Sequence, residues 1–261
     1  MTVVDIGYTG LTVSLILIVV ALALSAWQGL GLERSIVGAT LRALVQLLIV
    51  GLLLGFVIDD GRPLWLSWIW VSSIVVFAAS TVARRAPELP HVFAVGLAAN
   101  VVSVSVSVAV TFGFGIFPLT GRTLVPVAGM VTGNAMRTAV VGARRLTEAV
   151  AENRDDIEAR LALGHSPARA VRPTLRATLR LALLPQIEAN RTVGLVALPG
   201  AMTGLILAGT DPVDAVLVQA ALLFLILGAA AISVSVIGLI GSRGLFTGDE
   251  RLLAPARTAE S

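Results

Sequence analysis

The sequence predicts an all-α protein that crosses a membrane about seven times. The first observation is composition: 56% of the residues are hydrophobic and 13% are charged, whereas a soluble domain carries about 25% charged residues. The second is that several apolar stretches approach or exceed the ~18 residues typical of a membrane-spanning helix. The third is that the linkers between most of these stretches are very short. Together these observations predict a polytopic membrane protein.

The apolar stretches define the predicted spans, which we expect at residues 11–27, 36–58, 64–82, 92–114, 123–141, 188–208 and 213–240. The first stretch has no basic segment before it, so we expect it to span rather than to be a cleaved signal. The alternative is six spans, with the first stretch lying in the membrane interface. In the fourth stretch Ser103, Ser105 and Ser107 alternate with valine, but an open strand edge is untenable in lipid. We therefore predict a helix there too.

The distribution of arginine predicts the orientation. One set of alternating loops contains Arg34, Arg84 and Arg85, followed by a long basic insert and a basic tail, whereas the opposite set contains Arg62 and Arg122. Because cytoplasmic loops carry an excess of basic residues, we expect the first set in the cytoplasm. The N-terminus would then lie outside and the C-terminus inside.

A charged insert, residues 143–187, separates the fifth and sixth apolar stretches. Its first part has a charged helical pattern up to about residue 163, which can continue the fifth span. Gly164 is expected to end this helix. Ser166 followed by Pro167 is expected to cap and begin the next one. Pro173 is then expected to end or kink that second helix.

Two stripes with a spacing of four residues follow in the insert, and they predict an amphipathic surface helix. The stripes are basic (Arg172, Arg176, Arg180) and apolar (Leu175, Leu179, Leu183). Such a helix can simply rest on anionic lipid, which attracts each arginine by about 1 kcal/mol. The other interpretation is that the insert binds a protein partner.

Several function classes lack the residues that they need. All 19 basic residues counted as Lys or Arg are arginine, and a P-loop needs a lysine on the phosphates. The chain therefore cannot itself be a P-loop ATPase. It has no cysteine, and no nucleophile–base pair of an enzyme can be assigned. We expect no enzymatic activity, no cofactor in this chain and no nucleic-acid partner.

The insert resembles the docking loop of ABC transporter permeases. Glu158-Ala159, with Gly164 six residues after the glutamate and Leu184-Pro185 later, is similar to the E-A-A-x-x-x-G … L-P pattern. That loop forms a short helix that docks in a groove on the cytoplasmic ATPase. Two departures are that Arg160 replaces the second alanine and that the distance from the glycine to Leu-Pro is longer than usual.

Three further segments resemble FetB-type ABC permeases, small permeases linked to iron export in bacteria, with plant relatives in aluminium tolerance. The segments are "LRALVQLLIVGLLLGFVI" (41–58), "GMVTGNAMRTAV" (129–140) and "NRTVGLVALPGAMTGLILAGTDPVDAV" (190–216). In the last segment Ala201 stands where the family often has methionine. The similarity runs from about residue 42 to 236, with the motifs in the same order.

This resemblance implies the permease subunit of an ABC transporter in the bacterial inner membrane. Residues 1–261 would be one permease domain, which acts as a homodimer with two copies of a separate ATPase subunit and exports a metal ion such as iron. Insert 143–187 would couple to the ATPase through Glu158, Ala159, Gly164, Ser166 and Pro167. The alternative is a stand-alone secondary transporter or channel driven by an ion gradient, for which Glu188 is the candidate intramembrane carboxylate.

Polar and helix-breaking residues inside the predicted spans are the candidates for the substrate path. They are Arg42, Gln46, Asn134, Met136, Pro199, Gly200, Met202 and Thr203. A charge such as Arg42 costs about 2.5–3.5 kcal/mol at bilayer depth, unless it snorkels to the headgroups or pairs with a residue such as Glu188. Transporters build sites where helices break, as Pro199-Gly200 predicts here, whereas Asn134 can simply link helices. No set has metal-ligand spacing, so no metal ligands are assigned.

Overall fold

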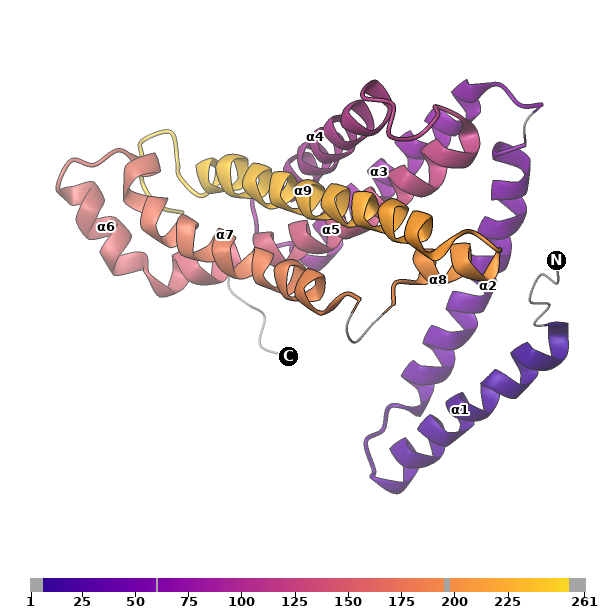
Figure 1. Ribbon diagram of the computed structural model, residues 1–261. Helices are drawn as coiled ribbons and strands as arrows, with labels where there is room; N and C mark the ends of the chain where they lie inside the picture. The colour runs from indigo at the N-terminus through magenta and orange to yellow at the C-terminus, as the bar shows by residue number, and fades with distance from the viewer. Residues whose placement is uncertain (1–6, 60, 195–197, 254–261) are drawn as a thin grey trace.

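The computed structural model describes residues 7–59, 61–194 and 198–253, and these residues form nine helices and no strand (Figure 1). The all-α class is therefore as predicted. The helices are α1 (Gly7–Trp27), α2 (Glu33–Val57), α3 (Leu64–Arg85), α4 (Val92–Gly113), α5 (Gly121–Glu152), α6 (Arg154–Ala162), α7 (Pro167–Thr192), α8 (Gly200–Leu207) and α9 (Pro212–Gly244).

Five of the helices are long and apolar enough to cross a membrane, namely α2, α3, α4, α5 and α9. This supports the predicted polytopic membrane protein. In α1 the apolar segment Leu15–Trp27 is shorter than a span, so the number of seven spans stays a prediction. Ser103, Ser105 and Ser107 lie in helix α4, as expected.

The predicted span at 188–208 is divided between two helices, and the division includes the predicted break at Pro199-Gly200. Residues 188–192 are the last turn of α7, and α8 begins only at Gly200. The eight residues of α8 extend about 12 Å, whereas the hydrocarbon core of a bilayer is about 30 Å thick. The apolar composition suits a span and Pro199-Gly200 indicates the break, but neither indicates that α7 already ends at Thr192.

Helices α3, α4, α5 and α9 form the central bundle. In its middle the Ser103 hydroxyl of α4 donates to the Ala229 carbonyl of α9 at 3.1 Å, and the Ser233 hydroxyl of α9 donates to the Ala135 carbonyl of α5 at 2.9 Å. Such bonds are favourable where lipid offers no alternative partner. Gly142 of α5 permits the close approach, because a Cβ atom there would lie 2.8 Å from the Val234 side chain.

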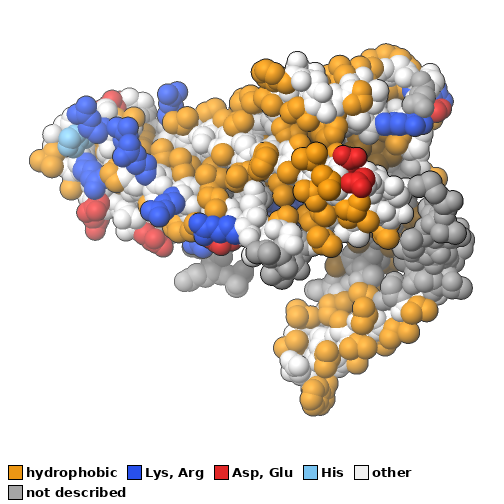
Figure 2. All heavy atoms as spheres, viewed as in Figure 1, with side chains coloured by type: hydrophobic (Ala, Val, Ile, Leu, Met, Phe, Trp, Pro, Cys, Tyr) orange, Lys and Arg blue, Asp and Glu red, His pale blue; other side chains and the backbone are white. Residues whose placement is uncertain are grey.

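Helix α5 extends well beyond the bundle, which agrees with the prediction that the insert continues the fifth span. Its 32 residues measure about 48 Å. The α6–α7 hairpin follows at the far end, and most of the charged side chains visible in Figure 2 gather there. Helices α1 and α2 form a separate hairpin that projects away from the bundle (Figure 1), and the apolar 18-residue window of α2 has no buried side chain.

Pro173 does not end the second helix of the insert, which was one of the two expected outcomes. Helix α7 continues through Pro173 and Pro185 to Thr192. Tertiary packing explains the difference: the tips of Leu175 and Leu179 lie against Gly238 of α9, where an added Cβ would be 2.9 and 2.7 Å from them. The apolar stripe of α7 thus faces α9 rather than lipid.

Candidate functional site

The turn between α6 and α7 has the local structure that the sequence predicts. Gly164 has φ +81°, a left-handed conformation that glycine adopts without strain. Its N–H donates to the Leu161 carbonyl at 2.9 Å, and the N–H of His165 donates to the Arg160 carbonyl at 3.1 Å. These two bonds form a Schellman motif, which ends a helix. The turn is therefore defined by local hydrogen bonds as well as by its glycine.

Helix α7 begins at the predicted position. Ser166 is the N-cap residue and Pro167 the first helical residue, although the Ser166 side chain makes no capping hydrogen bond. The Ser166 carbonyl instead accepts from the N–H groups of Arg169 and Ala170, both at 2.9 Å. Across the turn, the Arg160 guanidinium donates to the Ala170 carbonyl at 3.2 Å. This bond ties the two helices of the hairpin together.

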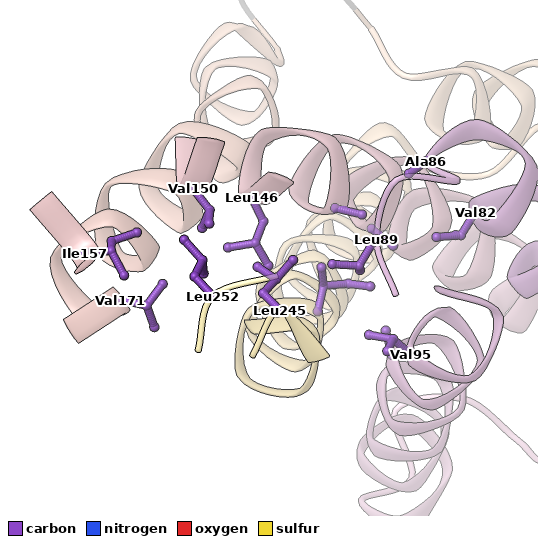
Figure 3. Close-up of a cluster of buried hydrophobic side chains, with 14 of the residues drawn as sticks. Val82, Ala86, Leu89, Val95, Leu146, Val150, Ile157, Val171, Leu245 and Leu252 are labelled. Atoms are coloured by element: carbon purple, nitrogen blue, oxygen red, sulfur yellow. The ribbon is translucent and has the colours of Figure 1, made fainter. Parts of the chain in front are cut away.

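A buried cluster attaches the hairpin to the rest of the molecule. Ile157 of α6 and Val171 of α7 are buried beside Val150 of α5 and Leu252 of the C-terminal segment (Figure 3). The side chains of one hairpin face thus pack on the extension of α5. The α6–α7 hairpin, residues 154–171, is consequently part of the folded body and leaves its other face exposed.

Among the predicted docking residues, Glu158 forms an ion pair in the structure. Its carboxylate lies 2.7 Å from the guanidinium of Arg154, four residues earlier. Arg154 also donates to the Leu253 and Leu252 carbonyls at 3.0 and 3.4 Å. Glu158 therefore pairs within its own chain, and Arg154 links α6 to the C-terminal segment.

The remaining docking residues lie on the outside of the hairpin. Ala159, Gly164 and Ser166 are exposed and Pro167 is half-buried. Leu163, which the sequence reasoning missed, is 79% exposed at the tip. An apolar residue directly before a helix-ending glycine is the signal that could have identified it. The tip thus presents an exposed apolar side chain directly before Gly164, with the polar Ser166 close by in sequence, a mixed surface suited to a protein partner.

The predicted substrate-path residues are distributed over three separate elements. Arg42 and Gln46 are exposed on α2, and among the described residues Arg42 has no ion-pair partner. Glu188, suggested as that partner, instead binds Arg191 at 2.6 Å. Asn134 of α5 donates to the Met130 carbonyl of its own helix at 2.8 Å, and this bond does not link it to another helix.

The predicted helix break is present, and Gly200 within it is exposed. Pro199 is the N-cap residue of α8 and Gly200 its first residue, and a Cβ atom at Gly200 would meet nothing within 4 Å. Thr203 donates to the Pro199 carbonyl at 3.2 Å, while Met202 is half-buried, like Met136 of α5. A single copy of the chain therefore does not assemble these candidates into one site.

Two polar residues of the bundle, Arg137 and Gln219, were missed from the sequence. Arg137 is an exposed cation within the predicted fifth span, and its position in an apolar stretch was the available signal. Asn100 and Gln219 are buried, and their side-chain oxygens have no hydrogen-bond partner among the described residues. No group of three or more His, Cys, Asp or Glu residues in the described part of the chain is arranged to hold a metal ion.

Comparisons with known proteins agree with the resemblance seen in the motifs. The model of an uncharacterised protein family, UPF0014, matches residues 8–246. UPF0014 membrane protein STAR2 of Oryza sativa subsp. japonica is 38% identical over 218 residues, which are 83% of this chain and 75% of that protein. "Probable iron export permease protein FetB" of Escherichia coli (strain K12) is 34% identical over 231 residues, 88% of each chain.

A third relative, "Protein ALUMINUM SENSITIVE 3" of Arabidopsis thaliana, is 31% identical over 222 residues, 84% of this chain and 80% of that protein. No solved structure matches the chain significantly. The family match extends from the first helix to the last, and the comparisons confirm the resemblance to FetB-type permeases and their plant relatives. The chain therefore belongs to the UPF0014 family of membrane proteins.

Proposed function

We propose that this protein is the permease subunit of an ABC transporter and exports a metal ion such as iron, powered by ATP hydrolysis in a separate subunit. The observation that carries the proposal is the α6–α7 hairpin, which is ordered by its own hydrogen bonds and exposed at the charged end of the molecule. The cargo is suggested by the relative from Escherichia coli, whose name describes an iron export permease.

The contacts of the hairpin suit it to transmit a movement. An ATPase that binds Leu163 and Gly164 at the tip would push on α6 and α7 as one unit, because Arg160 joins them. Ile157 would carry this displacement to the extension of α5, and α7 would carry it to α9 through Leu179. Both receiving helices belong to the central bundle, so a local event at the tip would reach the membrane helices.

The sequence has no lysine, and a P-loop needs one, so this chain has no P-loop of its own. This supports an ATPase on a separate subunit. We place the chain in the bacterial inner membrane with the N-terminus outside, the C-terminus inside and the charged part of insert 143–187, which includes the α6–α7 hairpin, in the cytoplasm. Two copies of the permease would work with two copies of the ATPase. This arrangement also suits the path candidates on α2, α5 and α8, because a single copy does not bring them together.

The test compares two glycines that have the same backbone strain. Gly164 and Gly115 have φ +81° and +69°, and a Cβ atom at either would meet nothing within 4 Å. Leucine should therefore strain both positions by about 1–2 kcal/mol without a clash inside the chain. Only Gly164 lies on the proposed docking surface; Gly115 lies in the α4–α5 loop.

Gly164→Leu should abolish binding of the P-loop ATPase that co-purifies with the wild-type protein from its native membrane, whereas Gly115→Leu should retain it. Efflux of Fe²⁺ should then require ATP in vesicles that contain both subunits. Retained ATPase binding and coupled efflux in Gly164→Leu would contradict the docking role. Fe²⁺ movement by the purified chain alone, driven by an ion gradient, would instead establish the secondary transporter.

A further inference from the structure

The last turns of α7 carry an ion pair in an unexpected place. The Glu188 carboxylate and the Arg191 guanidinium are 2.6 Å apart, and their side chains are 55% and 69% exposed. On the neighbouring face Gln186 donates to the Asn190 side-chain oxygen at 3.4 Å, and both residues are half-buried. The end of α7 is thus polar on the outside, although it belongs to a largely apolar molecule.

The contacts of α7 place this ion pair at the middle of the bundle. Leu179 lies against Gly238 of α9, and the two helices run side by side in opposite directions (Figure 1). Glu188 is nine residues beyond Leu179, or about 14 Å along the helix. The same distance from Gly238 reaches about Ala229, whose carbonyl accepts the Ser103 hydroxyl halfway along α4.

An exposed ion pair at the middle of the membrane bundle would be costly in contact with lipid. Charged groups in the hydrocarbon region almost always face the bundle interior, a partner or a water-filled cavity. In the described part of the chain no other segment covers the Glu188 and Arg191 side chains. Something other than the described part of this copy must therefore shield them from the hydrocarbon.

The exposed residues around the pair form a stripe with heptad spacing. Leu181, Leu184, Glu188 and Arg191 follow one another at intervals of three, four and three residues, and all four are exposed. This spacing is typical of helices that pair along a common seam. These four residues are distinct from Leu175 and Leu179, which pack on Gly238 of α9.

We propose that two copies of this chain pair along the α7 seam, defined by Leu181, Leu184, Glu188 and Arg191. The inference rests on the homodimer in the proposed function and identifies its surface. A twofold axis along the membrane normal would set the two α7 helices parallel, so the same patch meets itself. Glu188 of each copy then lies diagonally opposite Arg191 of the other copy, and the leucines bury the rest of the seam.

The charge pattern makes the seam self-complementary, which favours a second copy over other occupants. Each copy contributes one anion, Glu188, and one cation, Arg191. When two copies meet, each Glu188 can pair with the Arg191 of the other copy, so no charge is left unpaired. The leucine positions continue the same stripe toward the charged end of the molecule, so the contact would extend over about three helical turns. A water-filled cavity would not need Leu181 and Leu184 on the same stripe.

The decisive test separates pairing between copies from pairing within one copy. Glu188→Arg leaves two arginines in the seam, and Arg191→Glu leaves two carboxylates, so neither variant can form the ion pair alone. Co-expressed with different tags, the two variants form it only across a mixed dimer. Each alone should lose co-capture of its tagged copy by about tenfold or more, and the mixture should restore it.

The matched control is Glu148→Arg, which breaks an exposed ion pair of the same spacing with Arg145 at 3.3 Å but lies outside the seam. It should pair like the wild type. Single-residue variants Leu184→Cys and Phe77→Cys in this cysteine-free chain add a second readout. Oxidation in membranes should link copies at position 184 and not at position 77, which is 58% exposed on α3.

The possible failures are distinguishable. If wild-type copies capture each other but Leu184→Cys does not cross-link, or if the charge variants pair individually as well as the wild type, the α7 seam is wrong and the dimer uses another surface. If wild-type copies do not capture each other in membranes, the homodimer of the proposed function is itself wrong.

Discussion

Substitution of Gly238 by alanine should show how closely α7 packs on α9. The new Cβ atom would lie 2.7 Å from one methyl carbon of Leu179 and 2.9 Å from one of Leu175, so both leucines must move. Overpacking of this kind costs about 1–3 kcal/mol, which lowers the ratio of folded to unfolded protein roughly 5- to 150-fold. The loss should appear in denaturant unfolding of the protein in detergent.

Two further variants show whether the loss of stability comes from the contact between α7 and α9. Gly228→Ala lies on the same helix in open space and should stabilise it by about 0.5–1 kcal/mol, as alanine does in a helix interior. Leu179→Ala removes the side chain that the new Cβ atom at position 238 would clash with. The double variant should therefore lose less stability than the sum of the two single losses, by about 0.5 kcal/mol or more. If Gly238→Ala stabilises the protein as Gly228→Ala does, the close contact between α7 and α9 is wrong.

Other expectations follow from the same structure. With single cysteines at Ser166 and Gly61, an impermeant thiol reagent on intact cells should label only position 61; labelling of position 166 alone would reverse the orientation. Gly200→Leu fills open space beside the helix break and should stop transport while the protein still assembles with its ATPase. The control Gly51→Leu fills open space on α2 and should leave transport unchanged. Normal transport by Gly200→Leu would show that Gly200 does not line the substrate path. Ile157→Ala, a buried position, should cost about 2–5 kcal/mol and release α6, seen as faster proteolysis near residue 164; unchanged proteolysis would mean that Ile157 does not anchor the hairpin.

Local features of this chain were predictable where neighbouring residues determine the structure. The apolar stretches of α3, α4 and α9 are long enough to specify their helices, so the predicted bounds of 64–82, 92–114 and 213–240 lie close to those observed. The turn at Gly164 was predictable for the same reason, because the hydrogen bonds that form it join residues only a few positions apart.

Contacts between distant segments decided the features that were missed. Pro173 alone indicates the end of a helix, yet α7 continues because α9 supports it at Gly238. Residues 188–208 have the apolar composition of a span, yet they divide between the end of α7 and α8. A hydrophobic pattern records which residues avoid water, but it does not record which neighbour covers them.

The sequence by itself determined that the protein is an α-helical membrane protein, that it carries the motifs of its family and that a charged hairpin follows the fifth long helix. The tertiary structure decided how α7 lies along α9, and through that contact the depth of Glu188 and Arg191. The physical reason is that length and composition set the free energy of placing a segment in a membrane, whereas the position of one helix along another depends on how the side chains of both fit together.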